Sequence, residues 1–302
     1  MNKYLQAKFL PLIVLAASVP AVLLRIITII PGPDRDGLYA DRPVCWTLLW
    51  VVTLAVIAVI FLVSRQLKTP GRYPDNFPKS IPGAIGCAAA ALAVLVAGIQ
   101  GLLVSLAPQS PSALINLPLL GILTGLLGMV SAACLGFTAI CRFTGKKTHF
   151  LTHAIPCLYF ALRLFDCCRI WSNETQTGVF LFQFLTSVCI MLATYQLCCF
   201  DVNLGNRKSS LFWSLSGVYF CLLALPMGDD LLFYACAGLW LATNLCSLRP
   251  LKAKPQEAPE TAQTPQIIED VPTDAPVTDP VHETEEAPIS AYAEILSQLE
   301  QE

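Results

Sequence analysis

Long apolar runs, separated by short polar breaks, fill the first 250 residues of the chain. A bilayer core about 30 Å thick is crossed by roughly 20 apolar residues in a helix. Eight runs approach or exceed that length, so the pattern predicts an all-α integral membrane protein, a bundle of eight transmembrane helices over residues 1–250. The runs lie at about 9–30, 45–64, 81–107, 113–141, 149–171, 178–200, 210–227 and 230–248.

The breaks and the small residues refine this bundle. Pro108 and Pro111 bracket a very short connection, which predicts a tight antiparallel hairpin between the third and fourth runs. The first run is longer than the apolar part of a signal peptide, so we expect it to remain as a transmembrane helix. The fourth run carries a row of small residues, which lets helix backbones approach closely within one chain. The row consists of Gly121, Gly125, Gly128, Ala132 and Gly136.

The chain changes character after residue 250. Residues 251–288 are rich in proline and acidic side chains and contain no aromatic residue, which is typical of a disordered linker. Apolar residues then recur at helical spacing within 289–302, which predicts a short amphipathic helix, too short to be stable alone. Two interpretations remain open, a docking peptide for a cytoplasmic protein partner and a frayed terminus without a role. The docking candidates are Tyr292, Ile295, Leu296 and Leu299.

Charge is scarce and unevenly divided. Only 13% of the residues are charged and 55% are hydrophobic, whereas soluble domains carry about 25% charged residues. All 19 Lys and Arg precede residue 255, and 12 of the 21 acidic residues follow it. With eight spans, 14 Lys and Arg fall on one side of the membrane and 2 on the other. This indicates a multi-pass protein of the cell membrane with both termini in the cytoplasm. The expected partners are the lipid bilayer and a cytoplasmic protein that binds the tail, with no nucleic acid.

The fifth run is anomalous, because ionisable residues inside a span are costly and are functional candidates by default. At 100° per residue, Tyr159, Arg163, Asp166 and His153 share an arc of about 140°. Arg163 and Asp166, three residues apart, are placed to pair directly. Polar faces on neighbouring runs are positioned to complete an outward-opening pocket, in which the arginines favour an anionic group and an aspartate is a counter-charge or proton carrier. These faces contribute Arg25, Gln183 and Asp230.

Several functional hypotheses follow from these features. The leading one is a small-molecule or ion transporter with a polar pocket between the fifth, sixth and eighth helices. The alternative is a non-transporting membrane anchor, sensor or assembly factor that acts through its acidic tail. An intramembrane enzyme is the least favoured, since the chain has no phosphate-binding loop, no GxSxG elbow and no HExxH motif. The polar stripe also fits a purely structural role, with Arg163 and Asp166 as a neutralised pair and with Asp229 and Asp230 as caps at the N-terminus of the eighth helix, where acids suit the helix dipole.

No cofactor or metal ion is expected. His149, His153 and Cys157 follow i, i+4, i+8 spacing, but at 100° per residue Cys157 drifts off the face that the histidines share. The 13 cysteines lie in apolar runs or at their ends and form no CxxC motif. In such positions cysteine is a small packing residue rather than a metal ligand.

Overall fold

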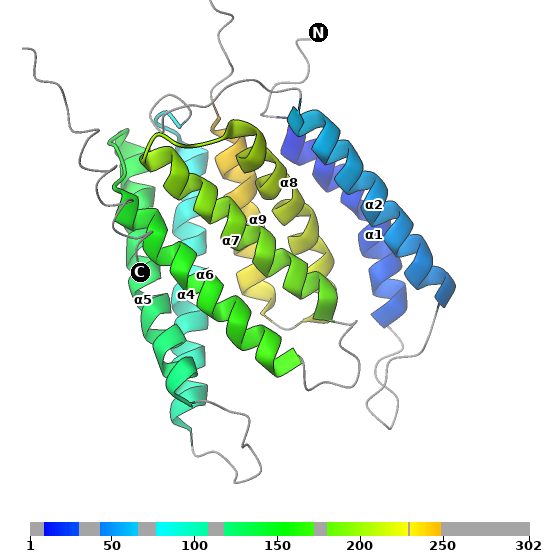
Figure 1. Ribbon diagram of the computed structural model, residues 1–302, viewed down its shortest axis with the longest axis horizontal. Coiled ribbons are helices and arrows are strands. Elements are labelled where there is room, and N and C mark those ends of the chain that lie inside the picture. The colour runs from blue at the N-terminus through cyan, green and yellow to red at the C-terminus, as the bar shows by residue number, and fades with distance from the viewer. Residues whose placement is uncertain are drawn as a thin grey trace, which may run out of the picture. The chain divides into compact units, whose positions relative to one another are not determined.

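Every regular element among the described residues is a helix. The computed structural model describes residues 9–29, 43–65, 77–107, 118–171, 180–228 and 230–248, all within the unit Met1–Lys252. The linker and docking helix predicted for 251–302 lie outside these residues. The elements are α1 (Leu10–Ile29), α2 (Pro43–Arg65), α4 (Ile81–Leu106), α5 (Pro118–Thr144), α6 (Phe150–Trp171), α7 (Leu181–Asp201), α8 (Arg207–Ala224), the 3-10 turn η2 (Leu225–Met227) and α9 (Leu231–Cys246) (Figure 1).

Seven of the described helices are long and apolar enough to cross a membrane. The predicted all-α, apolar architecture is confirmed at that level, but the eighth run does not form a helix of full spanning length. Helix α9 has 16 residues, which makes it about 24 Å long, shorter than a bilayer core of about 30 Å. The cause is local. Gly228 and Asp230 both have left-handed backbones, with φ of 80° and 53°, so the chain turns there and α9 begins only at Leu231.

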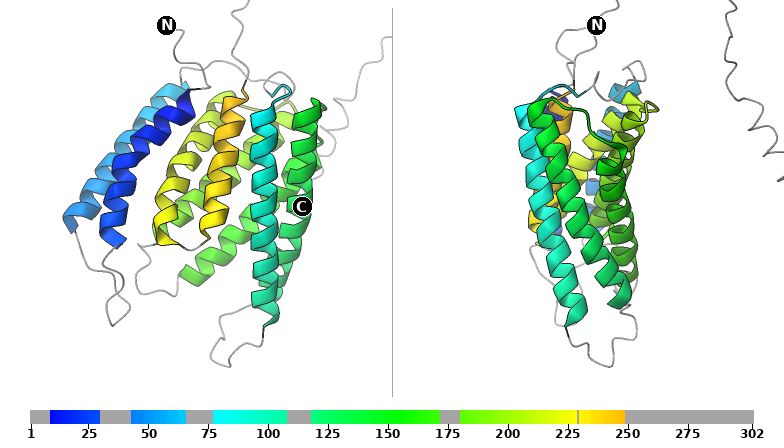
Figure 2. Two further views of the ribbon diagram at one scale, coloured as in Figure 1. Left: turned by 180° about the vertical axis from the view of Figure 1, so that it is seen from behind. Right: turned by 90° about the vertical axis from the view of Figure 1, so that its left-hand side faces the viewer.

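Six helices close into a ring. Each helix from α4 to α9 contacts the next one along the chain, and α9 contacts α4 again. In Figure 1, α6 and α7 run obliquely in front of α4 and α9, and the view from behind in Figure 2 brings α4 and α9 to the front. Large side chains fill the space inside the ring. Tyr159 and Phe160 of α6 and Trp240 of α9 are each exposed by 3% or less, and the rings of Phe160 and Trp240 lie 6.2 Å apart.

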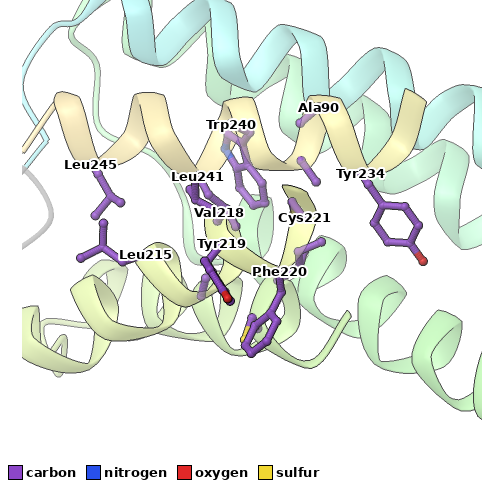
Figure 3. Close-up of a cluster of buried hydrophobic side chains, with 14 of the residues drawn as sticks. Ala90, Leu215, Val218, Tyr219, Phe220, Cys221, Tyr234, Trp240, Leu241 and Leu245 are labelled. Carbon is purple, nitrogen blue, oxygen red and sulfur yellow. The ribbon is translucent and has the colours of Figure 1, made fainter. Parts of the chain in front are cut away.

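Apolar side chains fill the seam between α8 and α9. Figure 3 shows Leu215 of α8 and Leu245 of α9 facing each other, with Val218 and Leu241 next along the seam. All four side chains are buried. Because lipid is as apolar as these side chains, close packing rather than escape from water holds the two helices together.

The α4–α5 hairpin depends on glycine. A Cβ atom on Gly125 would lie 2.9 Å from the carbonyl oxygen of Gly98, and one on Gly98 would lie 3.1 Å from that of Gly125. The ring of Tyr159 covers Gly128 in the same way, 3.0 Å from where a Cβ would be. The small residues predicted to allow close approach therefore do so at Gly125 and Gly128. Gly136 is different, because no atom lies within 4 Å of its Cβ position.

The α1–α2 hairpin packs against α8, outside the six-helix ring. A buried hydrogen bond, 3.0 Å between the hydroxyl oxygens of Thr53 on α2 and Tyr219 on α8, joins the two parts. Aromatic rings also join them, since Trp50 of α2 stacks on Phe182 of α7 with 5.4 Å between the ring centres. Helix α6 is thus part of the six-helix ring, and the α1–α2 hairpin lies against the side of the ring that α7 and α8 form.

Candidate functional site

Arg163 of α6 contacts Asp230 at the start of α9. Nη2 of Arg163 lies 2.5 Å from Oδ2 of Asp230, and the Arg163 and Asp230 side chains are 14% and 40% exposed. The guanidinium also lies over the ring of Phe233, 4.3 Å from the ring centre. We call the end of the bundle where α6 ends and α9 begins the Asp230 end. The carboxylate is the more accessible member of this pair.

Asp230 occupies the N-cap position of α9, yet its side chain makes no capping hydrogen bond. The backbone carbonyl of Asp230 accepts a bond of 3.1 Å from the amide of Tyr234, while the carboxylate is turned toward Arg163. A left-handed backbone at a residue other than glycine costs roughly 1–2 kcal/mol. The side chain of Asp230 therefore lies where an acid suits the helix dipole but makes no capping hydrogen bond, and the left-handed backbone aims its carboxylate at α6.

Two buried tyrosines extend this contact into the ring. Tyr159 lies one turn before Arg163 on α6, Tyr234 lies in the first turn of α9, and both are almost fully buried. Both phenols are within electrostatic reach of the guanidinium, and a phenol both donates and accepts hydrogen bonds. The site therefore combines one cation and one carboxylate with neutral polar groups. We call Tyr159, Arg163, Asp230, Phe233 and Tyr234 the Arg163 cluster.

A cavity of about 190 Å³ opens beside Asp230, between α4 and the start of α9. Small residues of α4 make the room for it, and Gln100 of α4 adds an amide. Asp230 thus belongs both to the ion pair and to the cavity wall. The lining residues are Ala93, Val96, Ala97, Gln100, Asp230, Leu231, Leu232 and Phe233.

Asp166 pairs with Arg169, not with Arg163 as expected. Oδ1 of Asp166 lies 2.9 Å from Nη2 of Arg169, and both side chains are about one fifth exposed. Both arginines are three residues away, but an acid placed before the base along the helix gives the better geometry and suits the helix dipole. Arg163 is then available to Asp230, which comes from another helix. Asp166 therefore lies in a separate pair near the end of α6.

Arg25 and Gln183 are buried elsewhere in the bundle. The guanidinium of Arg25 faces the rings of Trp46 on α2 and Phe182 on α7, at 5.7 and 5.0 Å. Gln183 is buried on α7, and its backbone carbonyl accepts the hydroxyl of Ser187. Neither Arg25 nor Gln183 lines the cavity beside Asp230. Polar faces of several helices were expected to converge on one pocket. Among them, the faces of α6 and α9 meet at the Arg163 cluster.

His153 lies at the opposite end of α6 and has a partner that the sequence did not suggest. Its Nδ1 lies 2.6 Å from Oδ2 of Asp201, the last residue of α7, and the hydroxyl of Thr148 donates to Oδ1 at 2.7 Å. We call this the Asp201 end of the bundle. One signal was available in the sequence: an acid at the C-terminal end of a helix is disfavoured by the helix dipole, so Asp201 requires a partner.

Among the side chains that the structure describes, no group of three or more His, Cys, Asp or Glu is arranged to hold a metal ion. No protein-family model, no curated protein and no solved structure matches the chain. The features of the chain that point to a function are the charged pairs that α6 makes with Asp230 at the start of α9 and with Asp201 of α7.

Proposed function

We propose that the chain is a membrane carrier for a small anion, with Arg163 as the binding cation and Asp230 as the counter-ion that the anion displaces. The observation that carries this proposal is a mostly buried guanidinium paired with a more exposed carboxylate at the edge of a cavity. In this proposal the Asp230 end faces outward from the cell membrane and both termini are cytoplasmic, as the distribution of Lys and Arg favours.

The chemistry of the pair supports displacement. A guanidinium is a planar fork that binds carboxylates and phosphates with two parallel hydrogen bonds, and Asp230 engages it through one carboxylate oxygen. An incoming anion of the same chemistry takes that place and keeps Arg163 neutralised, while Asp230 turns to solvent. The Asp230 side chain is 40% exposed, so its carboxylate remains hydrated when the anion displaces it.

The size of the cavity favours a ligand of few atoms. Its volume of about 190 Å³ is below the roughly 300–1,000 Å³ of sites that hold drug-sized molecules. The apolar wall of Ala93, Ala97 and Leu231 suits a short hydrocarbon part, and Gln100 suits a hydroxyl or carbonyl group. A small hydroxy- or oxo-carboxylate fits this lining, with inorganic phosphate as the second anion to examine.

Anion exchange in liposomes tests the proposal. The full chain is reconstituted, loaded with unlabelled L-lactate or phosphate, and supplied with the same labelled anion outside at equal pH, with protein-free liposomes as the blank. Arg163→Gln should abolish the exchange, and Asp230→Asn should lower the concentration at half-maximal rate because the competing carboxylate is gone. Arg169→Gln is the matched control and should exchange like the wild type, because Arg169 pairs with Asp166.

These opposite effects separate a binding site from a structural contact. If the pair only holds α6 to α9, Arg163→Gln and Asp230→Asn should act in the same direction. Wild-type exchange that equals the blank for both anions, or full exchange in Arg163→Gln, would sink the proposal. Wild-type exchange equal to the blank would also favour the non-transporting anchor.

A further inference from the structure

The charged pair His153–Asp201, at the Asp201 end, is buried more completely than Arg163–Asp230. The His153 side chain has no exposed surface and that of Asp201 is 2% exposed. Both oxygens of the Asp201 carboxylate have a donor, the Thr148 hydroxyl at 2.7 Å and the His153 ring at 2.6 Å. Because an ionised carboxylate only accepts hydrogen bonds, the ring hydrogen that faces Asp201 is on Nδ1.

The charge of this site depends on one proton. With a neutral imidazole, the buried site has a single negative charge held by two hydrogen bonds. With one added proton it becomes an imidazolium–carboxylate pair without net charge, which is the form that a surrounding of low dielectric tolerates better. Histidine is the side chain that ordinarily changes charge within the physiological pH range. The proton belongs to the pair as a unit rather than to one atom.

Other titratable groups lie on the elements that pack around this pair, and they are of different kinds. The thiols ordinarily stay neutral near pH 7, and lysine and arginine ordinarily stay charged. His149 directly precedes α6, and its side chain is exposed. The groups on the elements packed here are Arg142 of α5, Lys146, Lys147 and His149 of the α5–α6 connection, Cys157 of α6, Cys198 and Cys199 of α7 and Arg207 of α8.

Helix α6 connects the two charged pairs. His153 ties its beginning to α7, and Arg163, ten residues or about 15 Å further along, ties its later part to α9. Pro156 lies between them, and a proline inside a helix removes one backbone hydrogen bond and permits a bend. A change in either the His153–Asp201 or the Arg163–Asp230 pair therefore acts on α6, which can bend at Pro156 between the two pairs.

We infer that His153 and Asp201 form a proton-binding site, and that a proton bound there moves across the membrane together with the anion bound at Arg163. This inference rests on the proposed anion carrier. An anion alone is costly to move through hydrocarbon, since a charge at the bilayer centre is poorly solvated. One anion and one proton together add no net charge to the carrier, and both ligands are held by the same helix.

Two measurements on the reconstituted full chain test this coupling. The first is exchange of labelled L-lactate at equal pH, which needs no net proton movement. The second is the acidification of the liposome interior, followed with a trapped pH dye, when L-lactate is added outside. In His153→Gln and Asp201→Asn, exchange should persist, because the Arg163 cluster is untouched and anions that move in opposite directions carry no net charge across the membrane. Lactate-linked acidification should fall about tenfold, within the usual range for coupled sites.

His149→Gln is the matched control, because it removes a histidine four residues away that is not paired with Asp201; it should keep both activities. Histidine ¹⁵N NMR of the wild-type protein, with the His153 signal identified by its loss in His153→Gln, adds a readout that needs neither transport nor a folded Asp201 variant. The His153 ring should change its charge state within the pH range in which lactate-linked acidification is measured.

Failure of this inference can be told from failure of the carrier. Exchange in the wild type without lactate-linked acidification, unchanged acidification in His153→Gln, or a His153 ring that keeps one charge state across that pH range would each overturn the proton site while leaving the anion carrier standing. An absence of all exchange in the wild type would overturn the carrier, and the coupling with it.

Discussion

The hydroxyl of Thr53 on α2 lies 3.0 Å from the hydroxyl of Tyr219 on α8, and this buried hydrogen bond joins the α1–α2 hairpin to the six-helix ring. Tyr219→Phe should lower the free energy of unfolding in mixed micelles by about 0.6 kcal/mol, the average for polar contacts between membrane helices. Tyr195→Phe on the exposed face of α7 should have no measurable effect. A loss at Tyr219 no larger than that at Tyr195 would contradict a joining role for this bond.

Gly125→Leu should open the α4–α5 hairpin. The new side chain meets the carbonyl oxygen of Gly98 at 2.9 Å already at its Cβ atom, and overpacking of this kind costs about 1–3 kcal/mol or more. The yield of monodisperse protein after extraction and its unfolding temperature should both fall. Gly136→Leu on the same helix, where no atom lies within 4 Å, should leave both near their wild-type values, and an equal loss at the two positions would contradict this account.

Asp230→Asn should make the protein depend on added anion for stability. Without its partner carboxylate, the mostly buried Arg163 becomes an unpaired cation, and an unpaired hydrogen-bonding group costs about 1–3 kcal/mol. Binding of L-lactate or phosphate replaces the lost partner. An anion concentration of a hundred times Kd stabilises the folded protein by about 2.7 kcal/mol. Thermal unfolding should therefore show a lowered midpoint that either anion restores.

The double variant Arg163→Gln/Asp230→Asn supplies the control for that experiment. It keeps no cation at the site, so neither anion should raise its midpoint. A similar rise in the single and the double variant would mean that the anions act elsewhere on the protein.

Removal of residues 255–302 distinguishes the carrier from the alternative in which the tail does the work. The Arg163 cluster lies wholly within α6, α9 and the turn before α9, so the shortened chain should exchange anions at the wild-type rate per folded molecule. If the cytoplasmic docking hypothesis also holds, binding of a partner through Tyr292 and Leu296 is lost at the same time. Loss of exchange in a folded, shortened chain would contradict a site confined to the helices.

The sequence predicted the helical architecture well, because apolar length and helical periodicity are properties of each segment by itself. It also singled out α6, whose arc of Tyr159, Arg163 and His153 is visible without any neighbour. The length of α9 was harder to predict. Asp230 belongs to the apolar run when it is counted by composition, but its left-handed backbone places it in the turn before the helix.

The charged partners were not predictable from local spacing. Asp166 is three residues from both Arg163 and Arg169, and the choice between them depends on Asp230, 67 residues away in the chain. The partner of His153 is 48 residues away and lies at the edge of an apolar run. Both partnerships arise only when the ring brings α6 against α7 and the start of α9, which is a property of the whole bundle.

The contact between α4 and α9 also sets an order of assembly during synthesis. Each of the other ring contacts joins helices that follow one another along the chain, so it can form as soon as the second helix enters the membrane. The face of α4 that receives α9 must wait while about 140 residues are made, roughly 10–30 s at the usual rate of translation. The ring is thus completed last and by its shortest helix, and a ribosome that stops before α9 leaves an open arc in which Arg163 has not yet met Asp230.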